Sequence, residues 1–448
     1  MDKLMLMNDQ LNAVVWGKYM IFFLLFTGFW LMLRTRFLPF THARLILRKT
    51  LGSLGKGDKG DGVTPFQAVA TALAGTLGVG SVVGVTTALT MGGPGALLWM
   101  CVSAIFGMMT KYAEVVLAIH YRTRERDGTF IGGPMTTLEN GCHMGFLGIL
   151  FAVLCIFASF GIGNVTPANT IAHTITSYIS IPSWSIGLIM ALFIAWIIFG
   201  KGNLIMRFNE ITIPVISVLY IAACLYLIVL HADALPQALR LVWYDAMRPM
   251  AGVGGIGGFA ISRAMHFGIS RGVFSNEAGM GSSPISHACV SHANAIEQGF
   301  WGIFEVFFDT IVVCTITGLM ILTSGLLDSG MEGVAVTVAC FTSGFGHLGG
   351  IIFSFSIVAF AIPSILGWYY YARECLRYLF KGKLMLYIYQ GVFLVLLVFG
   401  AQLQLTFVWD VADTLNGLMA IPNLISLVIL CRVVVKLTKE YLEEHGSD

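Results

Sequence analysis

Charged residues are scarce in this chain. Asp, Glu, Lys and Arg account for 11% of the 448 residues, whereas a soluble globular domain carries about a quarter. The net formal charge of +2 is too small to indicate a nucleic-acid-binding surface. Hydrophobic residues reach 57% and the mean hydropathy is +0.82. This composition excludes an ordinary soluble domain and indicates a protein embedded in a lipid bilayer.

Motifs of enzymes and metal sites are missing as well. The sequence contains no C-x-x-C, no H-E-x-x-H and no G-x-S-x-G, which argues against a redox or metal centre and against two hydrolase classes. Its nine cysteines lie mostly in apolar runs, where a free cysteine acts as a small packing residue. We therefore predict that the chain is not an enzyme, forms no disulfide framework and uses no cofactor.

Long apolar segments fill most of the sequence. A bilayer requires about 20 residues of helix, and on that basis we predict about eleven spans, near residues 13–33, 65–92, 94–121, 145–179, 183–200, 209–231, 253–290, 296–326, 332–379, 384–401 and 405–436. The fourth, seventh and ninth are longer than a bilayer needs, so they must tilt, break or extend beyond it. Arg34 and Arg36 follow the first span where a signal peptide would have a cleavage site, so we predict a helix of the mature protein.

Basic residues indicate the orientation of these spans. Most of the 26 lysines and arginines lie in segments 34–60, 111–126, 201–207, 373–383 and 432–439. All of these segments fall on one side of the membrane if the chain crosses eleven times. Cytoplasmic loops carry the excess of Lys and Arg, so the N-terminus is predicted outside and the C-terminus inside.

Two spans contain clusters of glycine at equivalent places. The first is 65–91, with AGTLGVGSVVG at 74–84, and the second is about 257–288, with glycines around Ser275-Asn276-Glu277. Glycine disfavours an unbroken helix, and open backbone in a bilayer is tolerated only where protein covers it or a cavity solvates it. Close helix packing would explain one such segment alone. A matched pair is instead the pattern of a transporter's binding site.

The position of this pair predicts an internal repeat. After the first span, ten remain, and each group of five opens with a glycine-interrupted helix. Because five is odd, the two groups start on opposite sides of the membrane, which defines an inverted repeat. We predict an N-terminal helix and basic linker at 1–64, a first repeat at 65–251, and a second repeat with a cytoplasmic tail at 252–448.

Several motifs resemble one transporter family over essentially the whole chain. They are TALAGTLGVGSVVGVTTALTMGGPGALLWM (71–100), TKYAEVVLAIHYR (110–122), GGPMTTLENG (132–141), SFGIGN (159–164), SRGVFSNEAGMGSSPISHA (270–288), DTIVVCT (309–315), LGWYYYARE (366–374) and WDVADTLNGLMAIPNLISL (409–427). This pattern resembles the alanine/glycine:cation symporter family, which includes sodium:alanine symporters. The resemblance implies an all-α, LeuT-type 5+5 inverted repeat with one extra N-terminal helix, working as a monomeric carrier in the plasma (inner) membrane of a prokaryote.

Some positions depart from the family pattern. Val79 and Ser81 stand where members usually read G-T-G-N, and Pro167 replaces a usual glutamine. Around the ninth span's tryptophan, Pro363-Ser364 replaces neighbouring hydroxyls and Ala372-Arg373 replaces a G-E pair. These departures bear on the choice of substrate and ion more than on the fold.

The resemblance also implies a set of site residues. The expected substrate-binding residues are Thr76, Gly78, Val79, Gly80, Ser81, Asn276, Gly279 and Trp368, and the expected sodium-binding residues are Ala74, Leu77 and Ser364. The amides of Val79 and Gly80 are expected to face the substrate carboxylate, aided by a helix dipole. Asn276 could accept the ammonium or satisfy open backbone, and Trp368 could wall the pocket or lie in the core.

Four acidic residues lie within predicted spans: Glu114, Glu277, Glu305 and Asp309. An unpaired charge at the bilayer centre costs about 2.5–3.5 kcal/mol on insertion scales. Arg263 and Arg271 are the candidate partners of Glu305 and Asp309, which are four residues apart. We expect an ion-pair cluster, with a proton-carrying carboxylate as the alternative. His173, His266, His287 and His292 show no spacing typical of a metal site.

These observations predict a secondary active symporter. It would couple inward movement of sodium, or of a proton, to uptake of a small neutral amino acid, alanine or glycine. The alternative is a cation-coupled carrier of another small zwitterion or polar solute. A passive channel or facilitator is disfavoured because no repeated carbonyl filter loop is present. The expected partners are the amino acid and membrane lipid, without nucleic acid.

Overall fold

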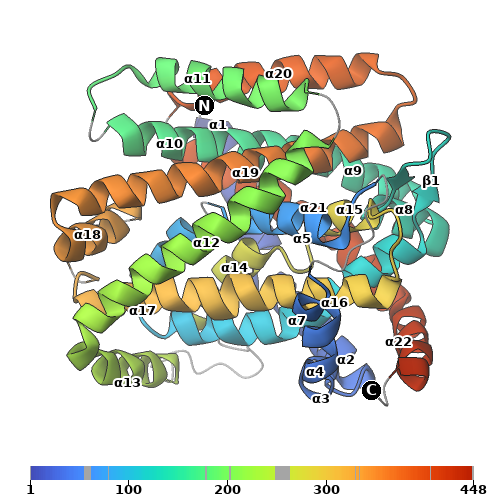
Figure 1. Ribbon diagram of the computed structural model, residues 1–448, viewed down its shortest axis with the longest axis horizontal. Coiled ribbons are helices and arrows are strands. Elements are labelled where there is room, and N and C mark those ends of the chain that lie inside the picture. Colours follow the sequence, from blue (N-terminus) through green and yellow to red (C-terminus); the bar gives the residue numbers. More distant parts are fainter. Residues whose placement is uncertain are drawn as a thin grey trace.

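The computed structural model describes residues 2–54, 62–78, 80–176, 179–200, 203–247, 263–327, 329–331, 333–403 and 405–445. Nearly all of this chain is helical, and the two described strands form one short antiparallel pair. Figure 1 shows long helices running roughly along the longest axis of the molecule, with α13 and α18 at one end and α8, β1 and α22 at the other.

The N-terminal part consists of α1 (Asp2–Val15), α2 (Lys18–Arg34), α3 (Leu38–Thr41), α4 (Ala43–Lys49) and the 3₁₀ turn η1 (Leu51–Ser53). The predicted first span therefore begins within α1 and continues through α2, with an interruption at Trp16 and Gly17. Helices α3 and α4 carry part of the basic linker.

The next part, up to residue 246, contains α5 (Pro65–Thr76), the π-helical turn η2 (Gly80–Gly84), α6 (Val85–Gly92), α7 (Ala96–His120), β1 (Thr123–Arg124), β2 (Phe130–Ile131), α8 (Pro134–Thr136), η3 (Thr137–Gly141), α9 (Gly145–Phe160), η4 (Gly161–Val165), α10 (Thr166–Thr176), α11 (Ser183–Ile198), α12 (Leu204–Leu230), η5 (Ala232–Ala234) and α13 (Leu235–Ala246). The predicted fourth span is thus α9 and α10, joined by the π-helical turn η4.

The last part contains α14 (Arg263–Asn276), α15 (Pro284–Ala288), α16 (Ala295–Val306), the π-helical segment η6 (Phe307–Cys314), α17 (Thr315–Ser324), α18 (Val334–Phe345), α19 (His347–Leu379), α20 (Leu384–Gly400), α21 (Leu405–Ile429) and α22 (Cys431–His445). The predicted ninth span, 332–379, which was too long for one bilayer crossing, is broken into α18 and α19. Gly346 has a φ of +61° and separates α18 from α19, a turn that hydropathy alone does not reveal.

Seven helices in the described chain are long and apolar enough to cross a membrane, or eight if the bent pair α5 and η2–α6 counts as one span. The apolar helices α11, α18 and α20 are shorter, at 16, 12 and 17 residues. The protein is therefore a multi-pass membrane protein. The predicted last span, 405–436, ends earlier than expected, because α21 stops at Ile429 and α22 follows as a separate helix.

Helix α7 is the central element of the packing. It contacts α2, α14 and α16, and most of its residues are buried from Ala96 to Ile119. A helix that is apolar all round is an interior helix. By contrast, α11 and α20 lie side by side at one edge of the molecule (Figure 1) and expose Trp184, Leu192 and Trp196. Such a face suits contact with lipid.

The basic linker and the C-terminal helix α22 both contact the first turn of α16. Glu297 Oε1 accepts hydrogen bonds from Lys49 Nζ at 2.7 Å and from Tyr441 Oη at 2.8 Å. These residues belong to α4 and α22, so one carboxylate joins three segments. The contact places the basic linker and the C-terminal helix on the same side of the molecule, as the charge pattern predicts.

Candidate functional site

The first glycine-rich segment is an interrupted helix. Helix α5 begins with a capping box, in which Thr64 and Gln67 each bond the other's backbone N–H, and Pro65 suits the first helical position. The helix ends at Thr76 and resumes at Gly80, with a bend of 47° between the two parts. Val79, expected to face the substrate, lies outside the described residues.

The second segment is interrupted over residues 277–283. Helix α14 ends at Asn276 and α15 begins at Pro284. Between them Glu277, Gly279 and Gly281 have φ values of +54°, +93° and +80°, which lie in the left-handed region that glycine adopts most easily. Residues 257–262 of the predicted run lie outside the described chain.

The two interruptions face each other. A Cβ atom placed on Gly80 would lie 3.4 Å from the Phe274 ring and 3.8 Å from Ser275 Cα. Ser275 Oγ also lies 3.0 Å from Ser81 Oγ. Helices far apart in the sequence therefore meet at the points where their regular hydrogen bonding is broken, and such points offer free backbone groups to a ligand.

A small cavity of about 20 Å³ lies between these breaks. Four parts of the chain line this cavity. They are the first break (Gly75, Thr76, Gly78 and Gly80), the η4–α10 segment (Ile162, Thr166 and Pro167), the end of α14 and the second break (Phe274 and Glu277), and α19 (Ser364 and Trp368). That volume accommodates about one water molecule. The walls would have to separate to admit an organic solute, so this arrangement corresponds to a closed form of the site.

Five of the predicted site residues line this cavity: Thr76, Gly78, Gly80, Ser364 and Trp368. Ser364 lies directly against the first break, because a Cβ on Gly78 would be 2.8 Å from Ser364 Oγ. Trp368 is 1% exposed and packs on Gly163, whose added Cβ would lie only 2.2 Å from Trp368 Cβ. Trp368 is thus a wall of the cavity as well as a core residue.

Other predicted residues have different neighbours. Asn276 donates to Thr310 Oγ1 at 3.0 Å and accepts from the Ala278 N–H at 3.0 Å, so it satisfies the helix break. Gly279 packs on Leu24, and its carbonyl accepts from Asn423. Ala74 and Leu77 are buried beside the first break.

Ser81 belongs to a buried cluster around Asp309. The Asp309 carboxylate lies 2.6 Å from Ser81 Oγ, 2.9 Å from Ser275 Oγ and 2.7 Å from Thr310 Oγ1. Ser81 Oγ is also 2.9 Å from the Thr76 carbonyl oxygen. These oxygens come from both broken helices and from η6, and within the described chain Asp309 has no ion pair. A carboxylate with hydroxyl and carbonyl oxygens around it suits a hard cation.

Glu305 belongs to a separate buried cluster around Lys111. Lys111 Nζ lies 3.4 Å from Glu305 Oε1 and donates to Ser283 Oγ and to the Glu277 carbonyl. His287 Nε2 is 3.2 Å from Glu305 Oε2. The expected ion-pair cluster is therefore present for Glu305, with a cation from α7, but Asp309 takes no part in it among the described residues.

The predicted arginine partners are wrong. Arg271 pairs with Asp413 of α21 at 3.1 Å, and Arg263 is exposed at the start of α14. Lys111 takes their place because α7 packs along both α14 and α16. That packing brings together residues more than 160 positions apart in the chain.

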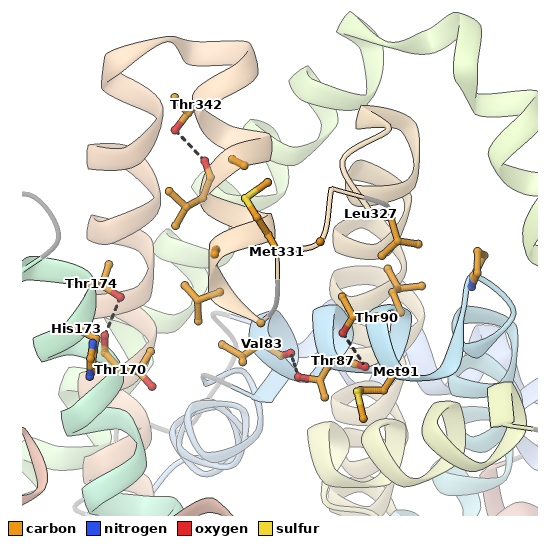
Figure 2. A pocket seen from close by; sticks show the side chains of 18 of the residues that line it. Val83, Thr87, Thr90, Met91, Thr170, His173, Thr174, Leu327, Met331 and Thr342 are labelled. Carbon is orange, nitrogen blue, oxygen red and sulfur yellow. Dashed lines mark hydrogen bonds between the residues drawn. The ribbon is translucent and has the colours of Figure 1, made fainter. Parts of the chain in front are cut away.

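A much larger cavity, of about 1160 Å³, lies beyond the first break. It is lined by Val83, Thr87 and Thr90 of η2 and α6, by Thr170, His173 and Thr174 of α10, and by residues of 327–342 (Figure 2). Several of its threonines bond to carbonyls of their own helices, as Thr87 does to Val83 at 2.9 Å and Thr174 to Thr170 at 2.7 Å. Its wall is consequently mostly apolar.

Comparison with known proteins agrees with this geometry. The model of the family described as "Sodium:alanine symporter family" matches residues 1–448. The chain belongs to the sodium:alanine symporter family. As the motifs indicated, this membrane protein is a transporter and not an enzyme.

Two relatives show the range of the sodium:alanine symporter family. The sodium/alanine symporter AgcS of Methanococcus maripaludis is 40% identical over 99% of this chain and 98% of its own length. The probable sodium/glutamine symporter GlnT of Bacillus subtilis is 33% identical, over 97% of this chain and 90% of its own length.

The fold is shared with more distant transporters. The substrate-bound, outward-open structure of a Na+-coupled sialic acid symporter gives a TM-score of 0.51 at 13% identity, covering 96% of this chain and 86% of that chain. The chain therefore shares the overall fold of this symporter.

Proposed function

We propose that this protein imports a small neutral amino acid, alanine or glycine, by symport with sodium. The observation that carries the proposal is the cavity enclosed by two broken helices that face each other, one at 77–79 and the other at 277–283. Open backbone at such a position needs a polar occupant, and alternating access around a central site is how inverted-repeat transporters work.

The cavity walls favour a short side chain. Ile162, Pro167, Phe274 and Trp368 form apolar walls close to Gly78 and Gly80. The substrate carboxylate is proposed to face the freed amides at 78–80, and Thr76, Ser81, Asn276 and Gly279 complete or support the site. The named relatives are a sodium/alanine symporter and a probable sodium/glutamine symporter, so another small zwitterion is the alternative cargo, especially with Val79, Ser81 and Pro167 in the sequence.

Sodium is proposed to bind next to the first break. Ser364 Oγ together with carbonyl oxygens of Ala74 and Leu77 supplies one set of ligands, supported by the close approach of Ser364 to Gly78. The oxygens of the Asp309 cluster supply a second set, which sequence reasoning did not assign to an ion. One cation moving down about 100 mV gains roughly 2.3 kcal/mol, enough for about fifty-fold accumulation of a neutral solute.

The proposed topology follows the charge pattern. We infer eleven crossings, with repeats at 65–251 and 252–448 after an N-terminal unit at 1–64; residues 248–262 around the second boundary lie outside the described chain. The cytoplasmic end would carry α4, α8 and α22, and the large cavity would open outward. The N-terminus would be outside, in the inner membrane of a prokaryote, with the monomer as the carrier unit.

The test is uptake by purified protein in liposomes. Radiolabelled alanine and glycine are offered with an inward sodium gradient, with choline in place of sodium, and with an inward proton gradient. Accumulation above equilibrium that requires sodium is the expected result, and accumulation that requires only the proton gradient would replace sodium by a proton.

The same assay separates the competing functions. Uptake that neither saturates nor exceeds equilibrium would indicate a passive channel or facilitator. Failure of every small amino acid under both gradients would contradict the symporter, and a wider panel of zwitterions would then identify the alternative cargo.

A further inference from the structure

Glu277 lies in the second break and is the one charged residue among the described residues that line the small cavity. Among the residues that line the small cavity, the rest are glycine, threonine, serine, proline or apolar residues. Glu277 is 2% exposed. We propose that the Glu277 carboxylate binds the ammonium group of the cargo, an inference that rests on the proposed function.

The backbone of Glu277 is held in an uncommon conformation. Its φ of +54° is unfavourable for a residue with a Cβ atom. Two contacts fix it there: the Glu277 N–H donates to the Val273 carbonyl at 2.8 Å, and Lys111 Nζ donates to the Glu277 carbonyl at 3.2 Å. Strained backbone of this kind persists mainly at functional sites.

The carboxylate itself forms no direct ion pair among the described residues. It accepts a hydrogen bond from Ser282 Oγ. Lys111, the nearby buried cation, directs its ammonium to the Glu277 carbonyl, to Ser283 Oγ and to Glu305. Arg271, in the same helix as the break, pairs with Asp413. A buried charge within a membrane requires a partner, and a cationic ligand in the cavity would supply it.

The neighbouring polar side chains of Asn276 and Asp309 already form hydrogen bonds within the protein. Asn276, the residue expected to meet the ammonium, bonds Thr310 and the Ala278 N–H. Asp309 has three hydroxyl groups within 2.9 Å of its carboxylate and does not line the cavity. Glu277 is therefore the acid that can meet a ligand between the two breaks.

This assignment fixes the orientation of the bound amino acid between the two breaks. Its carboxylate faces the first break at Gly78 and Gly80, and its ammonium faces Glu277 of the second. One short zwitterion then contacts both broken helices at once, with its side chain toward the apolar walls. The chemical class selected is a compact α-amino acid, and a monocarboxylate of the same size without the amino group would be rejected.

The experiment measures equilibrium binding of two ligands, alanine and propionate, to purified protein by calorimetry in saturating sodium. In the wild type, alanine is expected to bind much more tightly than propionate. Glu277→Gln should weaken alanine binding about 10- to 100-fold, the usual effect of losing a charge-assisted hydrogen bond, and leave propionate binding unchanged. The selectivity ratio is the readout.

Glu114→Gln is the matched control. Glu114 is also buried and accepts from the Gly281 N–H of the same loop at 3.1 Å, but it does not line the cavity. Its variant should keep the selectivity ratio. Glu277→Asp, which retains the charge but shortens the side chain, should give an intermediate ratio, and it serves in place of Glu277→Gln if that variant does not fold.

Three results would overturn the inference. If Glu277→Gln weakened the binding of alanine and of propionate by the same factor, the residue would only support the loop. An unchanged ratio in either Glu277 variant would place the ammonium elsewhere. Normal alanine binding with lost uptake in Glu277→Gln would indicate a proton carrier. If the wild type binds no small amino acid at all, the proposed function fails instead.

Discussion

The two broken helices open their backbones in different ways. At the first, α5 ends at Thr76, Leu77 has a φ of −73°, and η2 begins at Gly80. At the second, seven residues separate α14 from α15, and three of them have positive φ.

Their supports differ correspondingly. Charged and polar side chains from distant helices hold the second break. Lys111 donates to the Glu277 carbonyl and to Ser283 Oγ. Glu114 accepts from the Gly281 N–H, and Asn423 donates to the Gly279 carbonyl. The first break has Ser81 near Asp309 and Ser364 near Gly78. We therefore expect the second break to be the fixed side of the proposed site and the first to be the side that moves.

Removing the central cation of the second break should have the largest effect. Lys111→Met leaves Glu305 without its lysine partner, and loss of one member of a buried ion pair costs about 3–5 kcal/mol. We expect a large fall in melting temperature or failure to fold, measured by thermal unfolding in detergent. Lys436→Met is the control, because its pair with Glu440 is exposed and should contribute little. Equal stability of the two variants would contradict the fixed role of the second break.

Filling the first break should abolish binding while sparing the fold. In Gly80→Leu, the side chain would grow from a Cβ already 3.4 Å from Phe274, into the space between the breaks. Alanine binding should be lost, and because the cavity of about 20 Å³ must widen to hold the leucine, the melting temperature should fall modestly without loss of the fold. Gly84 lies four residues on and has no atom within 4 Å of an added Cβ, so Gly84→Ala should bind normally. Normal transport by Gly80→Leu would remove this break from the substrate site.

Adding one methyl group to the second break should destabilise it more modestly. Gly279 has a φ of +93°, and an added Cβ would lie 2.5 Å from Leu24 Cδ2. Strained backbone of this type costs about 1–3 kcal/mol. Gly279→Ala should lower the melting temperature, and it should lower it less in a Leu24→Ala background, where the steric contact is absent. If Gly279→Ala had no effect in that background, backbone strain would contribute nothing.

The smallest effect is expected from a substitution at the proposed sodium site. Ser364→Ala removes one proposed oxygen ligand from sodium, worth about 1 kcal/mol, so the sodium concentration for half-maximal uptake should rise about five-fold. Thr87→Ala is the control, since Thr87 bonds the Val83 carbonyl within its own helix. Sodium dependence that is unchanged in Ser364→Ala but shifted in Ser81→Ala would move the ion to the Asp309 cluster.

Much of the site could be predicted from local sequence. Glycines at 75, 78, 80 and 84 locate the first break because glycine weakens a helix wherever it stands. The family pattern then added Ser364 and Trp368, and both line the cavity. In the same way, long apolar runs identified the membrane-spanning helices that the structure describes.

Long-range pairings could not be predicted in this way. Lys111 and Glu305 are far apart in the sequence, and Arg271 was the nearer candidate; only the packing of α7 against α16 decides between them. Asn276 carries a polar side chain suited to a ligand, but its commitment to Thr310 depends on how η6 lies beside α14. Likewise, Gly346 looks like any glycine in an apolar run, although its positive φ divides two helices.

The contact of Lys49 and Tyr441 on Glu297 has a practical consequence for handling the protein. Eight residues, or about 12 Å of helix, separate Glu297 from Glu305 in the same segment. Trimming the tail before Tyr441, or pulling on it through a bulky fusion, would disturb the first turn of the helix that carries the partner of Lys111. Purification tags at the C-terminal end are better attached through a flexible spacer, so that they do not pull on α22.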